Sequence, residues 1–260
     1  RGALAQVVAT SGIMMGGISG SGVADTAALG SIMVPEMKKR KYDPDFSAAL
    51  VAASGSLGLI IPPSIALIIY GVTTQTSIGD LFVAGIIPGV LIGLCFCIYS
   101  YFVAKKRDYP REVNVNLEGI WTNFKRAIPA LAMPVIIILG IRGGAFTATE
   151  GGGIISLYAF IVGAFVYKEI KLKDVPKIFY EAAISTAVIA TIIAATSLFG
   201  WLLSSEQIPQ KVTSSLLSIT ENPLLILLLI NFIVLVIGMF IDSGPAIMLL
   251  APILAPVAQS

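Results

Sequence analysis

The chain has 260 residues, of which 56% are hydrophobic and only 12% are charged, and its net charge is +2. A soluble domain carries roughly twice that charged fraction, so the composition excludes an ordinary soluble protein and predicts an integral membrane protein. The small net charge gives no reason to expect a nucleic-acid partner. Histidine is absent, which removes the commonest general base and a frequent metal ligand.

The first apolar segment, Gly2–Met37, is interrupted by the glycine-rich stretch Gly16–Ala24 and then carries one acid, Asp25. Its two arms are too short for two separate spans, and the basic cluster Lys38–Lys41 follows. We therefore predict a re-entrant helical hairpin that opens toward the cytoplasm, with Asp25 and Thr26 capping its second helix. The alternative is two ordinary spans that use glycine for helix packing.

The next uncharged window, Phe46–Gly79, has 34 residues. At a rise of about 1.5 Å per residue it is too long for one straight span. It is interrupted at Ser54–Gly58 and again at Pro62-Pro63-Ser64. We predict a broken helix here, whose interruptions free backbone carbonyl groups.

Four further apolar segments are expected to span the membrane: Leu81–Ala104, Ile128–Ile141, Ile154–Tyr167 and Ala182–Leu203. If they cross in alternation, every basic cluster between them falls on the cytoplasmic side, including the linker 105–127. Within that linker, Leu117–Phe124 is predicted to form a short amphipathic helix on the membrane surface. Leu172–Ala183 is expected to do the same.

The last segment, Pro223–Ala258, repeats the form of the first hairpin, with Asp242-Ser243-Gly244-Pro245 between two apolar arms. It starts from the outer face in this threading, so we expect it to open outward. Two hairpins of opposite orientation are what an inverted-topology repeat produces.

Non-helical backbone at membrane depth survives only where it is buried or lines a polar cavity. Free carbonyl and hydroxyl oxygens suit a hard cation such as sodium, and helix N-termini suit a carboxylate. The predicted sodium ligands are Ser19, Gly20, Ser21, Ser54, Gly55, Ser56, Gly58, Pro62, Asp242, Ser243 and Gly244. The predicted substrate-binding residues are Ser19, Ser21, Asp25, Ser64, Glu150 and Asp242.

Two of these acids allow simpler interpretations. Asp25 is either only a helix cap or also a charge that tunes a nearby cation site, and we favour the second because an acid at this depth is costly unless it is functional. Glu150, judged by spacing alone, is equally compatible with an outer loop.

The sequence Gly17-Ile18-Ser19-Gly20 also suggests an intramembrane serine hydrolase. Such enzymes need a histidine to activate the serine, and the chain has none. A purely structural membrane subunit would need neither glycine-rich tips nor intramembrane acids.

Five stretches together resemble the large membrane subunit of the tripartite ATP-independent periplasmic (TRAP) transporters. They are "GGISGSGVADTAALGSIMVPEM", "YDPDFSAALVAASGSLGLIIPPSI", "GIRGGAFTATEGG", "FGWLL" and "NPLLILLLINFIVLVIGMFIDSGPAIMLLAPILAPV". The resemblance covers nearly the whole chain. It also places Glu150 in the family's Phe-Thr-x-Thr-Glu stretch.

The resemblance implies an all-α integral membrane protein with the elevator fold of the ion-transporter superfamily, built from inverted repeats, two re-entrant hairpins and broken helices. Residues 1–79 and 223–260 would belong to the moving elevator domain, and residues 80–222 to the scaffold and arm helices. The family's second broken helix would follow the second hairpin, and further scaffold helices would precede Arg1. The chain is therefore expected to be a portion of a longer one.

The function implied is sodium-coupled uptake of an organic anion, of the sialic acid or C4-dicarboxylate class, across the bacterial inner membrane. A periplasmic substrate-binding protein would deliver the solute, and a small membrane subunit, possibly fused, would brace the transport subunit. The alternative within transport is a stand-alone sodium/carboxylate symporter of the same fold.

Overall fold

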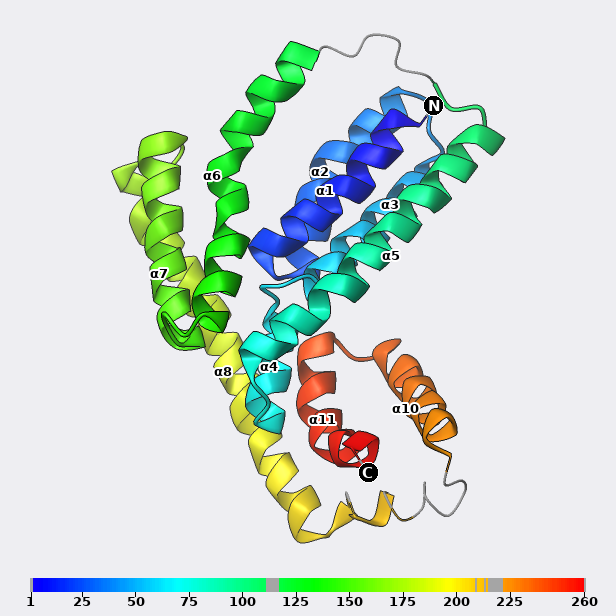
Figure 1. Cartoon of the computed structure of the whole chain (residues 1–260), viewed down its shortest axis with the longest axis vertical. Helices are drawn as coiled ribbons and strands as arrows, with labels where there is room; N and C mark the ends of the chain where they lie inside the picture. Colours follow the sequence, from blue (N-terminus) through cyan, green and yellow to red (C-terminus); the bar gives the residue numbers. More distant parts are fainter. Residues whose placement is uncertain (1, 111–116, 209, 213, 215–221, 260) are drawn as a thin grey trace. The chain divides into compact units, whose positions relative to one another are not determined.

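The computed structural model describes residues 2–110, 117–208, 210–212, 214 and 222–259. Within these residues it contains helices and turns but no strand, which confirms the all-α prediction. The first half contains α1 (Ala3–Ser19), α2 (Gly22–Lys39), α3 (Pro44–Gly55), the 3-10 turn η1 (Ser56–Leu59), α4 (Ile65–Thr74) and α5 (Ile78–Lys106). The second half contains α6 (Leu117–Arg142), α7 (Ala148–Ile161), the π-helical turn η2 (Val162–Val166), the 3-10 turn η3 (Leu172–Asp174), α8 (Val175–Ser205), α10 (Pro223–Gly238) and α11 (Ser243–Gln259) (Figure 1).

These elements form two compact units. The first unit comprises residues 1–67 and 77–169, and the second comprises residues 68–76 and 170–260. They are units of packing, so the predicted division into elevator parts (1–79 and 223–260) and scaffold (80–222) stays a prediction.

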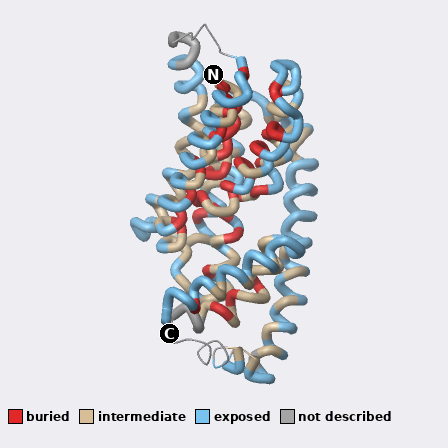
Figure 2. The backbone as a smooth tube through the Cα atoms, turned by 90° about the vertical axis from the view of Figure 1, so that its right-hand side faces the viewer, coloured by how far each residue is buried: buried red, intermediate tan, exposed pale blue. Residues whose placement is uncertain are grey.

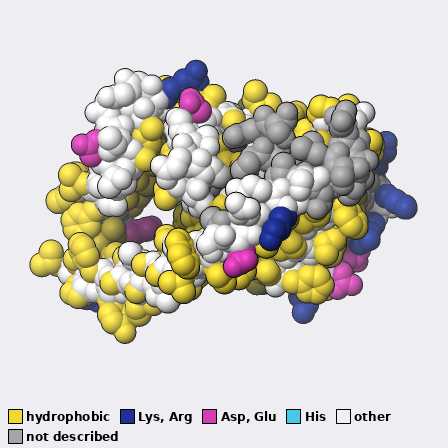
Figure 3. Space-filling view, turned by 90° about the horizontal axis from the view of Figure 1, so that it is seen from below, with side chains coloured by type: hydrophobic (Ala, Val, Ile, Leu, Met, Phe, Trp, Pro, Cys, Tyr) yellow, Lys and Arg dark blue, Asp and Glu magenta, His cyan; other side chains and the backbone are white. Residues whose placement is uncertain are grey.

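Within the described residues, four helical segments are long and apolar enough to cross a membrane. They are Ile78–Lys106, Trp121–Arg142, Ala148–Val166 and Leu172–Leu203, and they match the four spans predicted from the sequence. Many large apolar side chains on these helices are exposed, for example Leu139, Leu157 and Leu198. Figure 3 also shows hydrophobic side chains at the surface of one face. Lipid is the surrounding that suits such a surface.

The two predicted surface helices are not separate elements. Leu117–Phe124 is the beginning of α6, which continues through Pro129 and Pro134 to Arg142. Leu172–Ala183 is η3 followed directly by the first part of α8. A continuous helix satisfies its own backbone groups, and nothing between Phe124 and Ile128 interrupts it. Part of the predicted linker, residues 111–116, lies outside the described residues.

The first unit is built around the predicted hairpin. α1 and α2 run antiparallel and join at Gly20 and Ser21, and α3 and α5 pack beside them (Figure 1). The buried positions gather in this bundle (Figure 2), where Val8, Met37 and Val51 belong to one apolar cluster. The prediction of a helical hairpin at residues 2–37 is therefore confirmed, whereas its depth in a membrane is not tested.

The first unit also brings its basic clusters to one end. The beginnings of α1 and α6 and the ends of α2, α5 and α7 all lie at that end (Figure 1). The clusters Lys38–Lys41, Lys105–Arg107 and Lys125-Arg126 sit on these helix ends. This is the arrangement that the predicted cytoplasmic threading requires.

Contacts between glycines and backbone join the hairpin to the break that follows α3. A Cβ atom added to Gly12 would lie 2.5 Å from the carbonyl oxygen of Ser54. One added to Gly16 would lie 3.0 Å from the backbone nitrogen of Gly58. Only glycine allows backbones to approach this closely, so the hairpin and the break interlock.

α5 also presents glycines to the hairpin and the break. A Cβ on Gly85 would lie 2.6 Å from the carbonyl oxygen of Ile60, and Gly93 lies against the side chain of Ile13. Both glycines are in the interior of α5. The break and the distal half of α1 therefore lie beside the interior of a candidate span, away from its ends.

Side chains close the basic end of this bundle. The Asp43 carboxylate, between α2 and α3, accepts a hydrogen bond of 2.9 Å from the hydroxyl of Tyr109 and another from the guanidinium of Arg107. The ring of Tyr109 packs against that of Tyr42 in a tilted arrangement, with ring centroids 4.2 Å apart, and its centroid lies 5.8 Å from that of Phe46. The Tyr109 hydroxyl, and after it the Arg107 guanidinium, hold the pKa of Asp43 below its usual value.

The second unit contains the predicted second hairpin. α10 and α11 contact one another and are joined by residues 239–242, and α8 packs on α11. This confirms a helical hairpin over Pro223–Ala258. Whether it opens outward stays a prediction.

Replacing Gly55 by alanine is expected to destabilise the first unit, because the added Cβ would lie 2.7 Å from the backbone nitrogen of Thr26. Overpacking of this kind costs about 1–3 kcal/mol. Gly152→Ala is the matched control: nothing lies within 4 Å of its Cβ, and alanine favours a helix. Thermal unfolding of the two purified variants is the measurement, and equal midpoints would contradict the contact.

Tyr109→Phe should lower stability at neutral pH, because the Asp43 carboxylate loses a donor while the ring packing is retained. Because the pKa of Asp43 is lower in the folded than in the unfolded protein, its interactions stabilise the fold fully at pH values above the unfolded-state pKa, which is near 4. This stabilisation is lost as the pH falls through the folded-state pKa. The difference in unfolding midpoint from wild type should therefore shrink as the pH falls below about 4. Tyr99→Phe, at an exposed position of α5, should show no difference at any pH. A difference for Tyr109→Phe that does not depend on pH would exclude the Asp43 carboxylate as its cause and leave the hydrogen bond from the Asp43 N–H to the Tyr109 hydroxyl.

Candidate functional site

The hairpin tip is formed by two residues with distinct backbone roles. Gly20 adopts the left-handed conformation (φ 64°) and ends α1, and its N–H donates to the carbonyl of Gly16 at 3.3 Å. Ser21 is extended, and its hydroxyl accepts a hydrogen bond from the Ala24 N–H at 3.4 Å. Ser21 is thus the N-cap of α2.

The prediction that Asp25 and Thr26 cap this helix is wrong. α2 begins at Gly22, directly after the extended Ser21, so both residues already lie in its first turns. The Thr26 hydroxyl donates to the Gly22 carbonyl at 2.7 Å. Helix capping therefore does not explain the presence of Asp25 at this position.

Ser19 is engaged with the tip itself. Its Oγ accepts a hydrogen bond from the Ser21 N–H at 3.1 Å and donates to the Ser21 carbonyl at 3.3 Å. Ser19 is exposed, and both of these contacts are to backbone. They hold the turn and provide no base for a nucleophilic serine.

The Asp25 carboxylate is buried without a partner. The residue is 0% exposed, and neither carboxylate oxygen has a hydrogen bond among the described residues, although the Ser19 hydroxyl lies near it. A Cβ on Gly58 would lie 2.5 Å from Asp25 Oδ2, so the carboxylate lies directly against the backbone of η1. Burying a carboxylate without a partner is very costly.

Ser54 is the second unpartnered polar group of this region. It is 0% exposed, and its Oγ has no hydrogen-bond partner within the described residues. It precedes η1 and faces Gly12 of α1. The junction of hairpin and break therefore leaves three buried side-chain oxygens unsatisfied, two from Asp25 and one from Ser54.

The other predicted residues of the break have local partners. The Ser64 hydroxyl is buried and donates to the Leu59 carbonyl at 2.7 Å. The Ser56 hydroxyl donates to the Ala53 carbonyl at 2.7 Å and is exposed. Pro62 is buried, and its carbonyl oxygen would lie 3.6 Å from a Cβ on Gly17.

Backbone closes the connection between tip and break. The N–H of Ile65, at the start of α4, donates to the carbonyl of Gly20 at 3.1 Å. A Cβ on Gly20 would lie 2.6 Å from the carbonyl oxygen of Pro63. The structure thus brings the predicted residues of the first tip together with those of the break, within one unit.

Glu150 has a local role. It lies in the first turn of α7, where its Oε2 accepts hydrogen bonds from the N–H and the hydroxyl of Thr147 at 2.8 and 2.9 Å. The Thr147 hydroxyl accepts the Glu150 N–H in return, which completes a capping box. The segment is therefore the start of a helix that follows a short turn, and its position at the outer face stays a prediction. A substrate role for Glu150 stays a prediction.

Asp242, Ser243 and Gly244 lie at the start of α11 in the second unit. The Asp242 carbonyl accepts the Ala246 N–H at 3.1 Å. The nearest atom to a Cβ on Gly244 is Ile69 Cδ1 at 3.8 Å, an ordinary contact. This tip is therefore not interlocked as the first one is, and its meeting with the first tip stays a prediction.

The sequence interpretation missed Gly12 and Gly16 as contact residues. Their signal was present as the spacing Gly12, Gly16, Gly20, which places small residues on one helix face. Glycine was assigned either to a hairpin tip or to helix packing. The structure shows both, because the same helix packs through glycines and ends in a turn.

Within the described residues there is no group of three or more His, Cys, Asp or Glu side chains able to hold a metal ion. A transition-metal centre therefore has no ligand set there. The oxygens that are present, from a carboxylate, hydroxyls and backbone carbonyls, are ligands for a hard cation.

A hairpin interlocked with a broken helix, beside several apolar spans, suits a membrane carrier, and comparison with known proteins identifies which kind. All 260 residues match the family model of the DctM component of the tripartite ATP-independent periplasmic transporters. The chain belongs to this family. The resemblance to the large TRAP membrane subunit is thereby confirmed.

Named TRAP relatives are similar along the whole chain. The sialic acid TRAP transporter large permease protein SiaM of Vibrio cholerae is 41% identical over 259 residues, which cover 100% of this chain and 61% of that protein. The C4-dicarboxylate TRAP transporter large permease protein DctM of Pseudomonas aeruginosa is 37% identical with the same coverage. The isethionate TRAP transporter permease protein DctMQ of Oleidesulfovibrio alaskensis is 41% identical, over 92% of this chain and 38% of that protein. The chain thus spans about three-fifths of the length of SiaM and DctM.

Asp25→Asn is expected to raise the unfolding midpoint of the TRAP subunit in sodium-free buffer. An amide of the same shape removes the cost of burying an unpartnered charge, a gain on the order of 1–3 kcal/mol. Asp45→Asn is the control, because Asp45 also lies in the first turn of a helix but is exposed; it should change the midpoint little. A lower midpoint for Asp25→Asn would mean that the carboxylate has a stabilising partner.

Proposed function

We propose that this TRAP subunit carries out sodium-coupled secondary uptake of an organic anion by an elevator mechanism. The observation that supports this best is the set of unpartnered buried oxygens of Asp25 and Ser54 at the junction of hairpin and break. The protein would work in the bacterial inner membrane as a multi-pass subunit, consistent with its four candidate spans.

Sodium is the coupling ion that the donor set favours. A buried carboxylate needs a compensating charge, and sodium, a hard cation, takes oxygen ligands. The proposed ligands come from the tip (Ser19, Gly20, Ser21), from the break (Ser54, Gly55, Ser56, Gly58, Pro62) and, by the inverted repeat, from Asp242, Ser243 and Gly244. Ser56 is the weakest of these, since its hydroxyl is exposed and already bonded to Ala53.

The depth of the tip supports a re-entrant hairpin. Gly17, in the last turn of α1, lies against Pro134, where the distance from an added Cβ to Pro134 Cγ would be 3.4 Å. Pro134 is in the interior of the candidate span Trp121–Arg142. Gly93, in the interior of Ile78–Lys106, contacts Ile13. A hairpin whose first helix ends beside the interior of one span and packs against the interior of another would stop part-way across the membrane.

The anionic substrate would bind at the hairpin tips. The start of α2 offers N–H groups and the hydroxyls of Ser19 and Ser21 to a carboxylate, and Asp25, Ser64, Glu150 and Asp242 are the further proposed contacts. The sialic acid and isethionate transporters are both 41% identical to this chain, over 100% and 92% of it. Sequence identity therefore does not distinguish between these solutes. We propose an organic anion of the sialic acid or C4-dicarboxylate class.

The proposed partners are a periplasmic substrate-binding protein and a small membrane subunit. They are supported by the family description, which names a tripartite periplasmic transporter. The name DctMQ of one relative supports a fused small subunit as the alternative. A stand-alone sodium/carboxylate symporter remains the rival. An intramembrane serine hydrolase finds no support, because the relatives are named as permeases and Ser19 bonds to the tip backbone.

Uptake by proteoliposomes tests the proposal. They would contain the full-length protein with its small subunit, and labelled sialic acid and succinate would be offered with and without an inward sodium gradient and the cognate binding protein. We expect uptake that requires both. Asp25→Asn should reduce it by at least ten-fold, while Asp45→Asn should leave it near wild type.

The alternatives predict other results. Sodium-dependent uptake that ignores the binding protein would identify the stand-alone symporter. Uptake driven by a proton gradient without sodium would overturn the assignment of Asp25 and Ser54 to sodium. Sodium should also raise the unfolding midpoint of wild type but not of Asp25→Asn, since a ligand stabilises only the state that binds it.

A further inference from the structure

A groove outside the proposed transport site lies between the first part of α6 and the end of η2, the turn that follows α7. It has a volume of about 630 Å³ and is lined by Trp121, Lys125, Arg126, Pro129, Val166 and Tyr167, among others. The Tyr167 hydroxyl donates to the Arg126 carbonyl at 2.7 Å, and the Tyr158 hydroxyl donates to the Pro129 carbonyl at 2.8 Å. These hydrogen bonds fix the two helices against one another, so the groove is a built feature of the fold.

The charges in this groove are of one sign. Lys125 and Arg126 contribute two adjacent cations, and no acidic side chain is among the residues that line it. Neither cation has an ion pair within the described part of the chain. The Lys125 ammonium lies over the ring of Trp121, 5.3 Å from its centroid, and this contact positions it without neutralising it. The groove therefore presents donors for an anion.

Aromatic side chains border these cations. Trp121 stacks on Phe124 with ring centroids 6.0 Å apart, yet the two side chains remain 59% and 45% exposed. Tyr167, on the other wall, is partly exposed as well. Tryptophan and tyrosine prefer the boundary between hydrocarbon and headgroups. The groove thus places aromatic side chains from both of its sides next to the two cations of α6.

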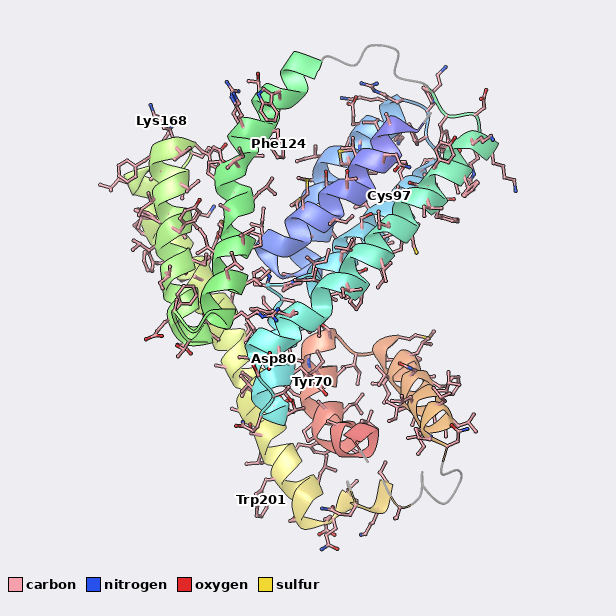
Figure 4. All side chains as sticks on the ribbon, viewed as in Figure 1. Tyr70, Asp80, Cys97, Phe124, Lys168 and Trp201 are labelled. Atoms are coloured by element: carbon pink, nitrogen blue, oxygen red, sulfur yellow. The ribbon has the colours of Figure 1, made fainter. Side chains whose placement is uncertain are left out.

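The position along the helices fits that boundary. Trp121 begins one candidate span, and Val166 ends the next. Figure 4 shows Phe124 and Lys168 at the same end of the α6–α7 pair, which is also the end where α2 and α5 place their basic residues (Figure 1). The groove opens where a span meets the cytoplasmic headgroup layer.

We propose that this groove binds the phosphate of an anionic phospholipid, with Lys125 and Arg126 holding the headgroup and with Trp121 and Tyr167 beside the glycerol and upper acyl chains. Arginine matches phosphate oxygens with a fork of donors, and lysine supplies a compact charge. A basic pocket between membrane helices on the cytoplasmic side is a general form of lipid headgroup site. A soluble phosphate would use the cations alone and leave the aromatic wall without a role.

Lipid binding to the full-length protein with its small subunit is the test. The complex would be exchanged into phosphatidylcholine nanodiscs with added phosphatidylglycerol, and retained lipid would be counted by native mass spectrometry. A photoreactive phosphatidylglycerol would map its contacts. The variant Lys125→Gln/Arg126→Gln should bind phosphatidylglycerol at least about ten-fold more weakly, since each cation near the surface contributes about a factor of five. Lys125→Arg/Arg126→Lys should retain most of the binding.

The matched control is Lys105→Gln/Lys106→Gln, which removes two exposed cations from the end of α5. It should leave binding unchanged, and crosslinks should map to residues 121–129 and 166–167. An equal loss in the control, or equal retention of phosphatidylcholine, would overturn the proposal. Displacement of the lipid by excess inorganic phosphate would assign the groove to a soluble anion. Crosslinks to the small subunit alone would mean that a protein covers the groove. Transport is not the readout, so failure here would leave the proposed function intact.

Discussion

The close approach of the hairpin α1–α2 to the break after α3 is the contact on which the rest of the first unit depends. An interrupted helix in an apolar setting must find partners for its backbone groups. Here the Ile65 N–H finds the Gly20 carbonyl, and glycines at positions 12, 16 and 58 let the two backbones meet. The same approach buries the side-chain oxygens of Asp25 and Ser54, which have no hydrogen bond within the described residues. The close approach of the two backbones thus accounts both for the packing of the hairpin on the break and for the buried oxygens of the candidate site.

Much of this fold was predictable because apolar runs, glycine tips and basic clusters each have a direct physical meaning. The four spans, the two helical hairpins and the break near Pro62 could all be placed from the sequence. Helix boundaries were harder to place. α6 runs from Leu117 through Pro129 and Pro134 to Arg142 without a break. Ser21 caps α2 because it is the extended residue directly before Gly22 and its hydroxyl accepts the Ala24 N–H. Partner choice was the least predictable feature, since Gly12 meets Ser54 only after the chain has folded back.

The two predicted tips look alike in sequence but differ in structure. The first is held by a left-handed glycine, a serine cap and a hydrogen bond from the N–H of Ile65 at the start of α4. At the second, Gly244 has ordinary space around it, and Asp242 is exposed. The sequence pattern of two apolar arms around a glycine predicts a turn between two helices. Whether that turn makes close backbone contacts depends on which residues pack against it in the folded chain. For this reason Asp25 has a structural argument for a site and Asp242 has the sequence argument alone.

The glycine contacts also constrain how this part of the molecule can deform. Ridges of backbone that meet at the distances found for Gly12 and Gly58 cannot slide past one another by a helical turn unless the helices first separate. The hairpin and the first half of the broken helix therefore behave mechanically as one stiff block. The irregular stretch between η1 and α4 belongs to the same block, because Ile60 and Pro63 lie as close to Gly85 and Gly20, and the Ile65 N–H donates to the Gly20 carbonyl.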